Sequence, residues 1–145
     1  MIFGDFLQEG HTCNSVFATE DSVHRYNPTS MQRRLRQALL ARGIEINTPD
    51  LNVGREVRFE LHVEGRPLGE RKCSRFLLAL ENPHINTLND DRNYVAGFDH
   101  AFTWNPKHFD LERVTPILIP NDMRREDFAP FAARDAFACL INANK

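Results

Sequence analysis

Two side chains stand where a layered α/β protein can carry its chemistry. Glu81 directly follows an apolar run at residues 76–80, and Trp104 ends a shorter run at residues 101–104. A carboxylate at the mouth of a buried strand is partly withdrawn from water, which makes it a better proton acceptor and suits it to general base catalysis. An indole offers an apolar face on which a sugar ring can stack. Taken alone, the residues go no further than a candidate base and a candidate aromatic stacking surface.

Each of these candidates also has a plainer interpretation. A glutamate at a strand end is often simply solvated, and a tryptophan belongs more often to a core than to a binding site. His84 and His100 could assist the same site, although a lone histidine is more often structural or on the surface. Asp90 and Asp91 look like a metal-binding pair. Because adjacent residues at a helix start point in different directions, pairing with the helix dipole explains them better.

The composition and the missing motifs exclude several functions. The sequence contains no G-x-G-x-x-G, P-loop, G-x-S-x-G, H-E-x-x-H or D-x-D motif, so no site for nucleotide phosphates is evident. The 18 basic and 20 acidic residues give a net charge of −2, which argues against a nucleic-acid partner. Cys13, Cys73 and Cys139 lack C-x-x-C spacing, so reduced thiols are expected rather than disulfides or a zinc site.

The elements that would position these residues alternate between strands and helices. Strands are predicted at residues 2–7, 44–47, 57–63, 76–80, 101–104, 115–119 and 137–141. Helices are predicted from Thr29 to Arg42, at residues 90–97 and at residues 127–134. Thr29 and Gln32 have the spacing of a capping box, and Gly43 is placed to end the first helix. This alternation predicts a Rossmann-like α/β domain with a mostly parallel sheet.

Two of the predicted strands differ in pattern. Residues 57–63 alternate between apolar and polar side chains, which predicts a half-exposed strand at an edge of the sheet. Residues 76–80 are continuously apolar, which predicts a central strand covered on both faces. Ligands of such sheets bind beyond the carboxyl ends of the strands, where Glu81 and Trp104 are expected.

Targeting signals are not evident. Residues 1–7 are mildly apolar, but Asp5 interrupts them and no basic stretch or cleavage site accompanies them, so they do not predict a signal peptide. No apolar run approaches the roughly 20 residues that a membrane span needs. We therefore expect a soluble, cytoplasmic protein.

Three segments in order resemble a known enzyme family. They are residues 80–83 (LENP), 98–105 (FDHAFTWN) and 116–121 (PILIPN), with further likeness at residues 43–50 (GIEINTPD) and 137–145 (FACLINANK). The order and spacing resemble the bacterial-type members of glycosyltransferase family 10, the α1,3-fucosyltransferases. That family shows Glu-Ser-Pro at the end of a strand and then Phe-Asp-x-x-Phe-Thr-Trp. Asn82 departs from the more usual Ser.

The resemblance implies an architecture and a reaction. The family has the two-domain GT-B fold, in which the N-terminal half binds the acceptor and the C-terminal half binds GDP-fucose. By this likeness, residues 1–135 form the acceptor-side domain and residues 136–145 begin the donor domain. The groups that hold the diphosphate would lie beyond Lys145, so the chain alone is expected to be inactive. It is expected to need no metal and no cofactor of its own, with GDP-fucose as the donor substrate of the full-length enzyme.

The resemblance also assigns roles to residues. The enzyme inverts the anomeric carbon, so a base must deprotonate the acceptor hydroxyl, and that role falls on Glu81. Contacts with the acceptor, such as lipopolysaccharide or a glycan containing N-acetylglucosamine, are expected from Trp104, His84, Asn82 and His100. Peripheral membrane association is a further expectation. The alternatives are a non-catalytic carbohydrate-binding module and an α/β scaffold with no role in sugar chemistry.

Overall fold

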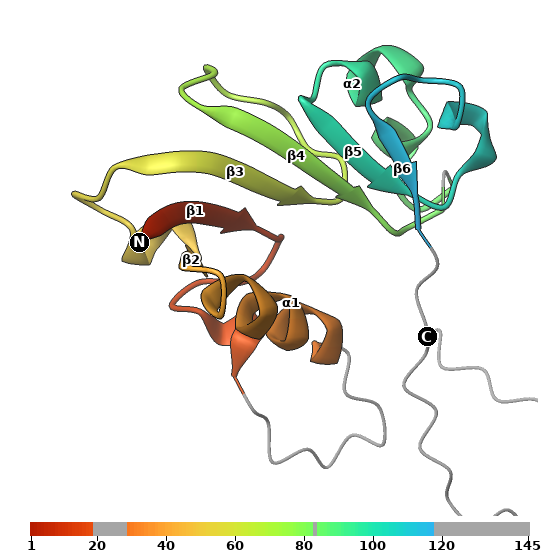
Figure 1. The fold of residues 1–145 in the computed structure, drawn as a ribbon. Coiled ribbons are helices and arrows are strands. Elements are labelled where there is room, and N and C mark those ends of the chain that lie inside the picture. The colour runs from red at the N-terminus through yellow and green to blue at the C-terminus, as the bar shows by residue number, and fades with distance from the viewer. Residues whose placement is uncertain (19–28, 83, 118–145) are drawn as a thin grey trace, which may run out of the picture.

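The chain folds around one six-stranded sheet. The computed structural model describes residues 1–18, 29–82 and 84–117. The strand order is β2-β1-β3-β4-β5-β6, and every neighbouring pair is parallel (Figure 1). The strands are β1 (Ile2–Leu7), β2 (Ile44–Asn47), β3 (Val57–Val63), β4 (Ser74–Ala79), β5 (His100–Thr103) and β6 (Val114–Pro116). The predicted α/β class with a parallel sheet is therefore confirmed.

Two α-helices cover opposite faces of this sheet. Helix α1 (Ser30–Leu40) connects β1 to β2, and α2 (Arg92–Ala96) connects β4 to β5 on the other face (Figure 1). Short 3-10 helices complete the connections: η1 (Ser15–Phe17), η2 (Pro49–Leu51), η3 (Thr87–Asn89) and η4 (Pro106–His108). The predicted helix at residues 127–134 and the predicted strand at residues 137–141 lie outside the described residues.

The end of helix α1 agrees with the sequence prediction, whereas its start does not. Gly43 takes a left-handed φ of 76°, as predicted, and its carbonyl accepts a 2.9 Å hydrogen bond from the backbone of Ile2 in β1. The predicted capping box is wrong, because Thr29 makes no side-chain cap and its hydroxyl instead accepts a 2.9 Å hydrogen bond from Arg33. Gln32 is buried and donates to the Gln8 side chain, which follows β1. A contact within the first turns of α1 thus occupies Thr29, and a tertiary contact occupies Gln32.

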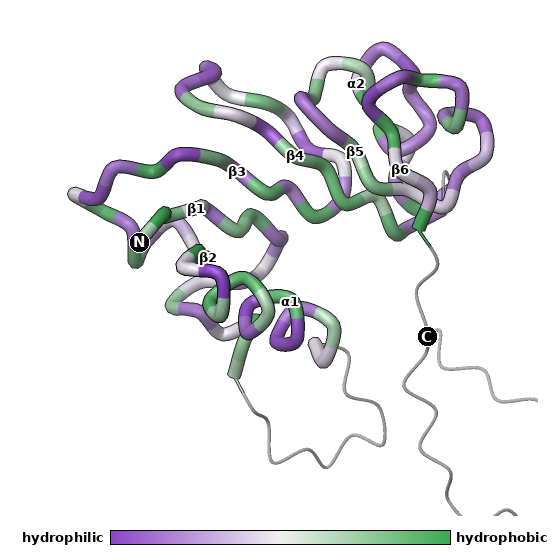
Figure 2. The backbone as a smooth tube through the Cα atoms, viewed as in Figure 1, coloured by the Kyte–Doolittle hydropathy of each residue, from purple (hydrophilic) through white to green (hydrophobic). Residues whose placement is uncertain are grey.

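Strand β3 lies in the interior of the sheet. It pairs with β1 on one side and β4 on the other, so the predicted edge position is wrong. The alternation of hydrophobic and hydrophilic residues along β3 is visible in Figure 2. Arg58 is exposed, but the other two polar side chains have partners within the sheet: Glu60 accepts a 2.8 Å hydrogen bond from Arg75 and lies 3.0 Å from the His62 ring nitrogen. A buried polar cluster produces the same sequence pattern as a solvated face.

Strand β4 is a central strand, as predicted, but its two faces differ. Leu77 and Ala79 are buried under α2, where they join a closed core of Val95, Phe98 and Ala101. On the other face, Phe76 and Leu78 line a groove toward α1. The prediction that both faces are covered is thus confirmed only in part, because Leu78 is buried whereas Phe76 is only partly buried. The connection from β3 to β4 contains no helix that could cover the second face.

The helices are short in the described part of the chain. None of them is long and apolar enough to cross a membrane.

Candidate functional site

The carboxyl edge of the sheet brings two of the predicted site residues together. Because Ala79 of β4 pairs with Thr103 of β5, the residues that follow each strand emerge side by side. The Trp104 indole nitrogen donates a 2.7 Å hydrogen bond to the carbonyl of Leu80, the residue before Glu81. The Trp104 side chain is nevertheless 42% exposed. The indole is therefore fixed in place next to the Glu81 turn with part of its ring system free for a ligand.

Glu64 holds this turn from the neighbouring strand. It follows β3 and takes a left-handed φ of 68°, a conformation that costs a residue with a side chain roughly 1–2 kcal/mol. Its carboxylate accepts backbone hydrogen bonds from Leu80 and Glu81, each at 3.1 Å. Sequence reasoning missed this residue, because a charged side chain in a polar loop carries no signal of such a role.

The buried side-chain amide of Asn89 holds the Glu64 carboxylate in position. The Asn89 side chain is 2% exposed, donates to Glu64 at 2.5 Å and to the Glu81 carbonyl at 3.1 Å, and accepts from the Gly65 backbone at 2.8 Å. A Cβ atom at Gly65 would lie only 2.4 Å from the Cβ of Leu88, so only glycine allows this close approach. The edge is thus preorganised by the segment around η3.

The Glu81 turn itself is exposed. The prediction of a partly desolvated Glu81 is wrong, since the residue is exposed in the structure. The side-chain oxygen of Asn82 accepts backbone hydrogen bonds from His84 at 2.9 Å and from Ile85 at 3.2 Å, which closes an Asx-type turn. His84 is exposed on the same turn. Three of the predicted site residues therefore share one surface loop.

His100 lies elsewhere. It begins β5, so it stands at the opposite end of that strand from Trp104. Its ring nitrogen lies 2.7 Å from the Thr115 hydroxyl on β6, and its ring packs beside Phe102 with centroids 5.0 Å apart. The structure does not bring His100 together with Glu81.

The two adjacent aspartates have separate structural roles. Asp91 caps α2 by accepting backbone hydrogen bonds from Asn93 at 2.9 Å and Tyr94 at 3.2 Å. Asp90 pairs with Lys107 at 2.7 Å, and that contact, with a hydrogen bond from the Asn105 amide, lowers the pKa of the Asp90 carboxyl. Within residues 1–18, 29–82 and 84–117, no group of three His, Cys, Asp or Glu side chains could hold a metal ion.

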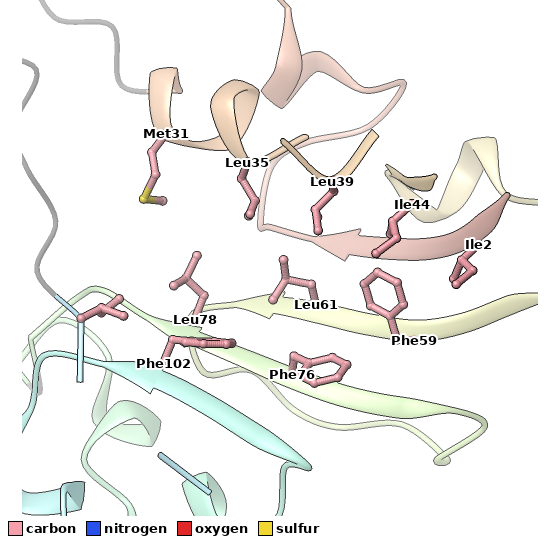
Figure 3. Close-up of a pocket in the computed structure, with 11 residues that line it drawn as sticks. Ile2, Met31, Leu35, Leu39, Ile44, Phe59, Leu61, Phe76, Leu78 and Phe102 are labelled. Atoms are coloured by element: carbon pink, nitrogen blue, oxygen red, sulfur yellow. The ribbon is translucent and has the colours of Figure 1, made fainter. Parts of the chain in front are cut away.

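An apolar groove of about 620 Å³ opens on the α1 face of the sheet. Figure 3 shows its two walls, whose side chains point toward one another across the gap. Helix α1 contributes Met31, Leu35 and Leu39, and the sheet contributes Phe59, Leu61, Phe76, Leu78 and Phe102. Neither Glu81 nor Trp104 lines this groove, so it is distinct from the carboxyl-edge site.

Comparisons of the chain with protein-family models, with curated proteins and with solved structures find no match. A functional interpretation therefore depends on the geometry of the carboxyl edge and on the motifs that lie there.

Proposed function

We propose that this chain is the acceptor-side half of an inverting glycosyltransferase of the α1,3-fucosyltransferase type, built on the GT-B architecture. The observation that carries this proposal is the 2.7 Å hydrogen bond that ties the partly exposed Trp104 indole to Leu80, beside Glu81. A sugar-stacking surface next to a carboxylate is the minimum that an acceptor site for this reaction requires. The motif resemblance covers the same residues.

The proposed reaction gives each residue a defined task. The acceptor sugar stacks on Trp104, and its attacking hydroxyl lies within reach of the Glu81 carboxylate. As the hydroxyl oxygen forms its bond to the anomeric carbon of fucose, the bond from that carbon to GDP breaks and the hydroxyl proton passes to Glu81. GDP-fucose is held by a donor domain that begins at residues 136–145. Closure of that domain over the edge supplies the desolvation that the exposed Glu81 lacks here.

Neighbouring side chains fit supporting roles. The His84 side chain is exposed on the Glu81 turn and is placed to hydrogen-bond a sugar hydroxyl. The Asn82 side-chain oxygen is occupied by its own turn, so Asn82 acts mainly by shaping the loop. His100, at the other end of β5, takes no part in the proposed acceptor site.

Acceptor binding is testable on the chain itself, because Trp104 is the single tryptophan of the sequence. Its fluorescence therefore reports on one place. Titration with oligosaccharides that end in N-acetylglucosamine should change the emission in a saturable way, and calorimetry should show the binding lost in Trp104→Ala. The control is Phe109→Ala, which removes another exposed aromatic side chain. Unchanged emission across a panel of such acceptors contradicts the proposal.

Catalysis is tested in the protein joined to its donor half. Glu81→Gln keeps shape and hydrogen bonding but cannot take up the proton, so kcat should fall about 10²–10⁴-fold while the acceptor KM changes little. Glu112→Gln, at another exposed glutamate, is the matched control. The exposure of Trp104 also favours a non-catalytic carbohydrate-binding module. That alternative predicts Trp104-dependent binding with no transfer of fucose and no effect of Glu81→Gln.

A further inference from the structure

The apolar groove between α1 and the sheet lacks a cover in the described part of the chain. Every described residue that lines it is an Ile, Leu, Met or Phe, so these walls offer no charged or polar side chain to a ligand. The Phe59, Phe76 and Phe102 side chains are only partly buried, although they pack against the core cluster on this face. Apolar surface of this extent seldom stays in contact with water on a soluble domain. The described lining therefore suits hydrocarbon side chains better than a polar ligand.

The position of the groove follows from the chain topology. Helix α1 connects β1 to β2 and lies over that end of the sheet, whereas α2 lies on the opposite face (Figure 1). The connections that flank β4 on this side place no helix over β4 and β5. Whatever covers these strands must come from another part of the chain or from another molecule.

The last described residue before position 118 lies on the groove wall. Ile117, which follows β6, is one of the lining residues, so the chain continues from the groove wall. The next 18 residues, 118–135, contain apolar side chains between charged ones, namely Leu118, Ile119, Met123, Phe128 and Phe131. The two phenylalanines match the hydrocarbon lining, and the charged residues beside them can remain in water.

The segment after Ile117 is long enough to span the groove. From β6 to β1 the sheet spans four strand spacings, roughly 19 Å at about 4.8 Å each. Phe128 is eleven positions after Ile117, and an extended chain of eleven steps covers up to roughly 36 Å. Phe128 can therefore arrive anywhere along the groove without disturbing the strands.

We propose that residues 118–135 of this chain cover the groove, with Phe128 and Phe131 inserted between α1 and the sheet. This inference goes beyond the proposed function, because it assigns an intramolecular role to a surface that Glu81 and Trp104 do not line. The rivals are a second copy of the chain and a free acyl chain, both of which need the groove to be vacant.

The direct test uses the intact chain with isotope-labelled methyl groups and phenylalanine rings. We expect NMR cross-relaxation between the Phe128 and Phe131 rings and the methyl groups of Leu35, Leu61 and Leu78. The contacts should persist on dilution and should be absent between chains in a mixture of labelled and unlabelled protein. Contacts that appear only between chains assign the groove to a second copy and overturn the proposal. Absence of any contact to these methyl groups also overturns it.

A substitution test needs no spectral assignment. Phe128→Ser with Phe131→Ser should raise the emission of a bound apolar dye, 8-anilinonaphthalene-1-sulfonate, several-fold above that of the parent chain and allow palmitate to compete for the site. The matched control is Phe137→Ser, which changes a phenylalanine beyond the proposed cover and should leave the emission near the parent value. Strong dye binding by the parent chain, or an equal response to Phe137→Ser, contradicts the assignment to residues 118–135. Unchanged far-ultraviolet circular dichroism distinguishes an uncovered groove from an unfolded chain.

Discussion

The two faces of the sheet are made by the same strands but are finished differently. On the α2 face, Leu77 and Ala101 are buried with Phe98, whose ring lies 5.4 Å from the His62 ring and 5.3 Å from that of Tyr94. On the α1 face, Phe76 and Phe102 have the same side chain as Phe98, but they are only partly buried and line a groove. Alternation along the strands sends apolar residues to both faces. How far a face is buried depends on which connecting segments cover it.

The α2 face also carries a polar cluster, whose side chains pair with one another across the strands. Asp5, Glu60 and Arg75 are register partners on three adjacent strands. Burial tends to raise the pKa of Glu60, but hydrogen bonds from His62 and Arg75 outweigh it and lower that pKa overall. Burial is the main reason why the pKa of His62 is lowered, so the neutral ring is favoured. Glu60, Arg75 and the His62 Nε2 atom are thus paired with one another on this face, whereas the described lining of the groove is hydrocarbon.

The largest expected effect lies in the closed core. Phe98 is 2% exposed, so Phe98→Ala should cost about 3–5 kcal/mol of the free energy of unfolding, measured in urea. The cost should be the same with or without Phe128→Ser and Phe131→Ser, because Phe98 packs with Leu77 and Val95 on the face opposite the groove.

Phe102→Ala is the matched change on the groove face. The loss in the free energy of unfolding caused by Phe102→Ala should be smaller when Phe128 and Phe131 are both serine. In that background the Phe102 ring has no cover, so its removal sacrifices little buried surface. Equal costs of Phe102→Ala in the two backgrounds, or a Phe98→Ala cost below about 1 kcal/mol, would remove the distinction between the faces.

A smaller effect is expected at the carboxyl edge. Glu64→Ala leaves the backbone N–H groups of Leu80 and Glu81 without their acceptor, which should cost about 1–3 kcal/mol. Loosening of the turn should also increase quenching of Trp104 fluorescence by acrylamide. Glu64→Gln keeps one acceptor oxygen and should lose less on both measures. If Glu64→Ala changes neither stability nor quenching, Glu64 does not position this site.

The smallest effect concerns Asp5. Burial, helped by the nearby Glu60 carboxylate, raises the pKa of Asp5 above its usual 3.8 despite a hydrogen bond from Asn52. The folded state therefore disfavours the ionised form, and it loses stability as the pH rises from about 3.8 through the raised pKa. Asp5→Asn removes this penalty and should stabilise the chain at pH 7, by less than about 1 kcal/mol because solvent partly screens the charge.

The pH profile provides the check on Asp5. Urea unfolding of the parent and of Asp5→Asn should differ at pH 7 and converge below about pH 3.8, where Asp5 is protonated in both states. A gain that persists undiminished in acid would point to packing rather than charge.

Local pattern was sufficient for the elements and for part of the site. The apolar runs located every described strand to within a few residues, and the position of Gly43 ended α1 correctly, because side-chain period and left-handed backbone preference are local properties. The rule that parallel strands share a carboxyl edge also anticipated that Glu81 and Trp104 emerge close together. These features require only that the strands be parallel and adjacent.

The tertiary structure decided what each surface faces. Residues 57–63 alternate in sequence whether their polar side meets water or meets Arg75 and Asp5, so only the strand order could place β3 in the interior. Glu64 became the support of the Glu81 turn through contacts with residues 16 and 17 positions away, and Asn89 joined it from 25 positions away. Burial and hydrogen bonding depend on such long-range neighbours, which a local pattern does not encode. The sequence alone determined which residues could do chemistry, and the packing of distant segments decided which of them meet.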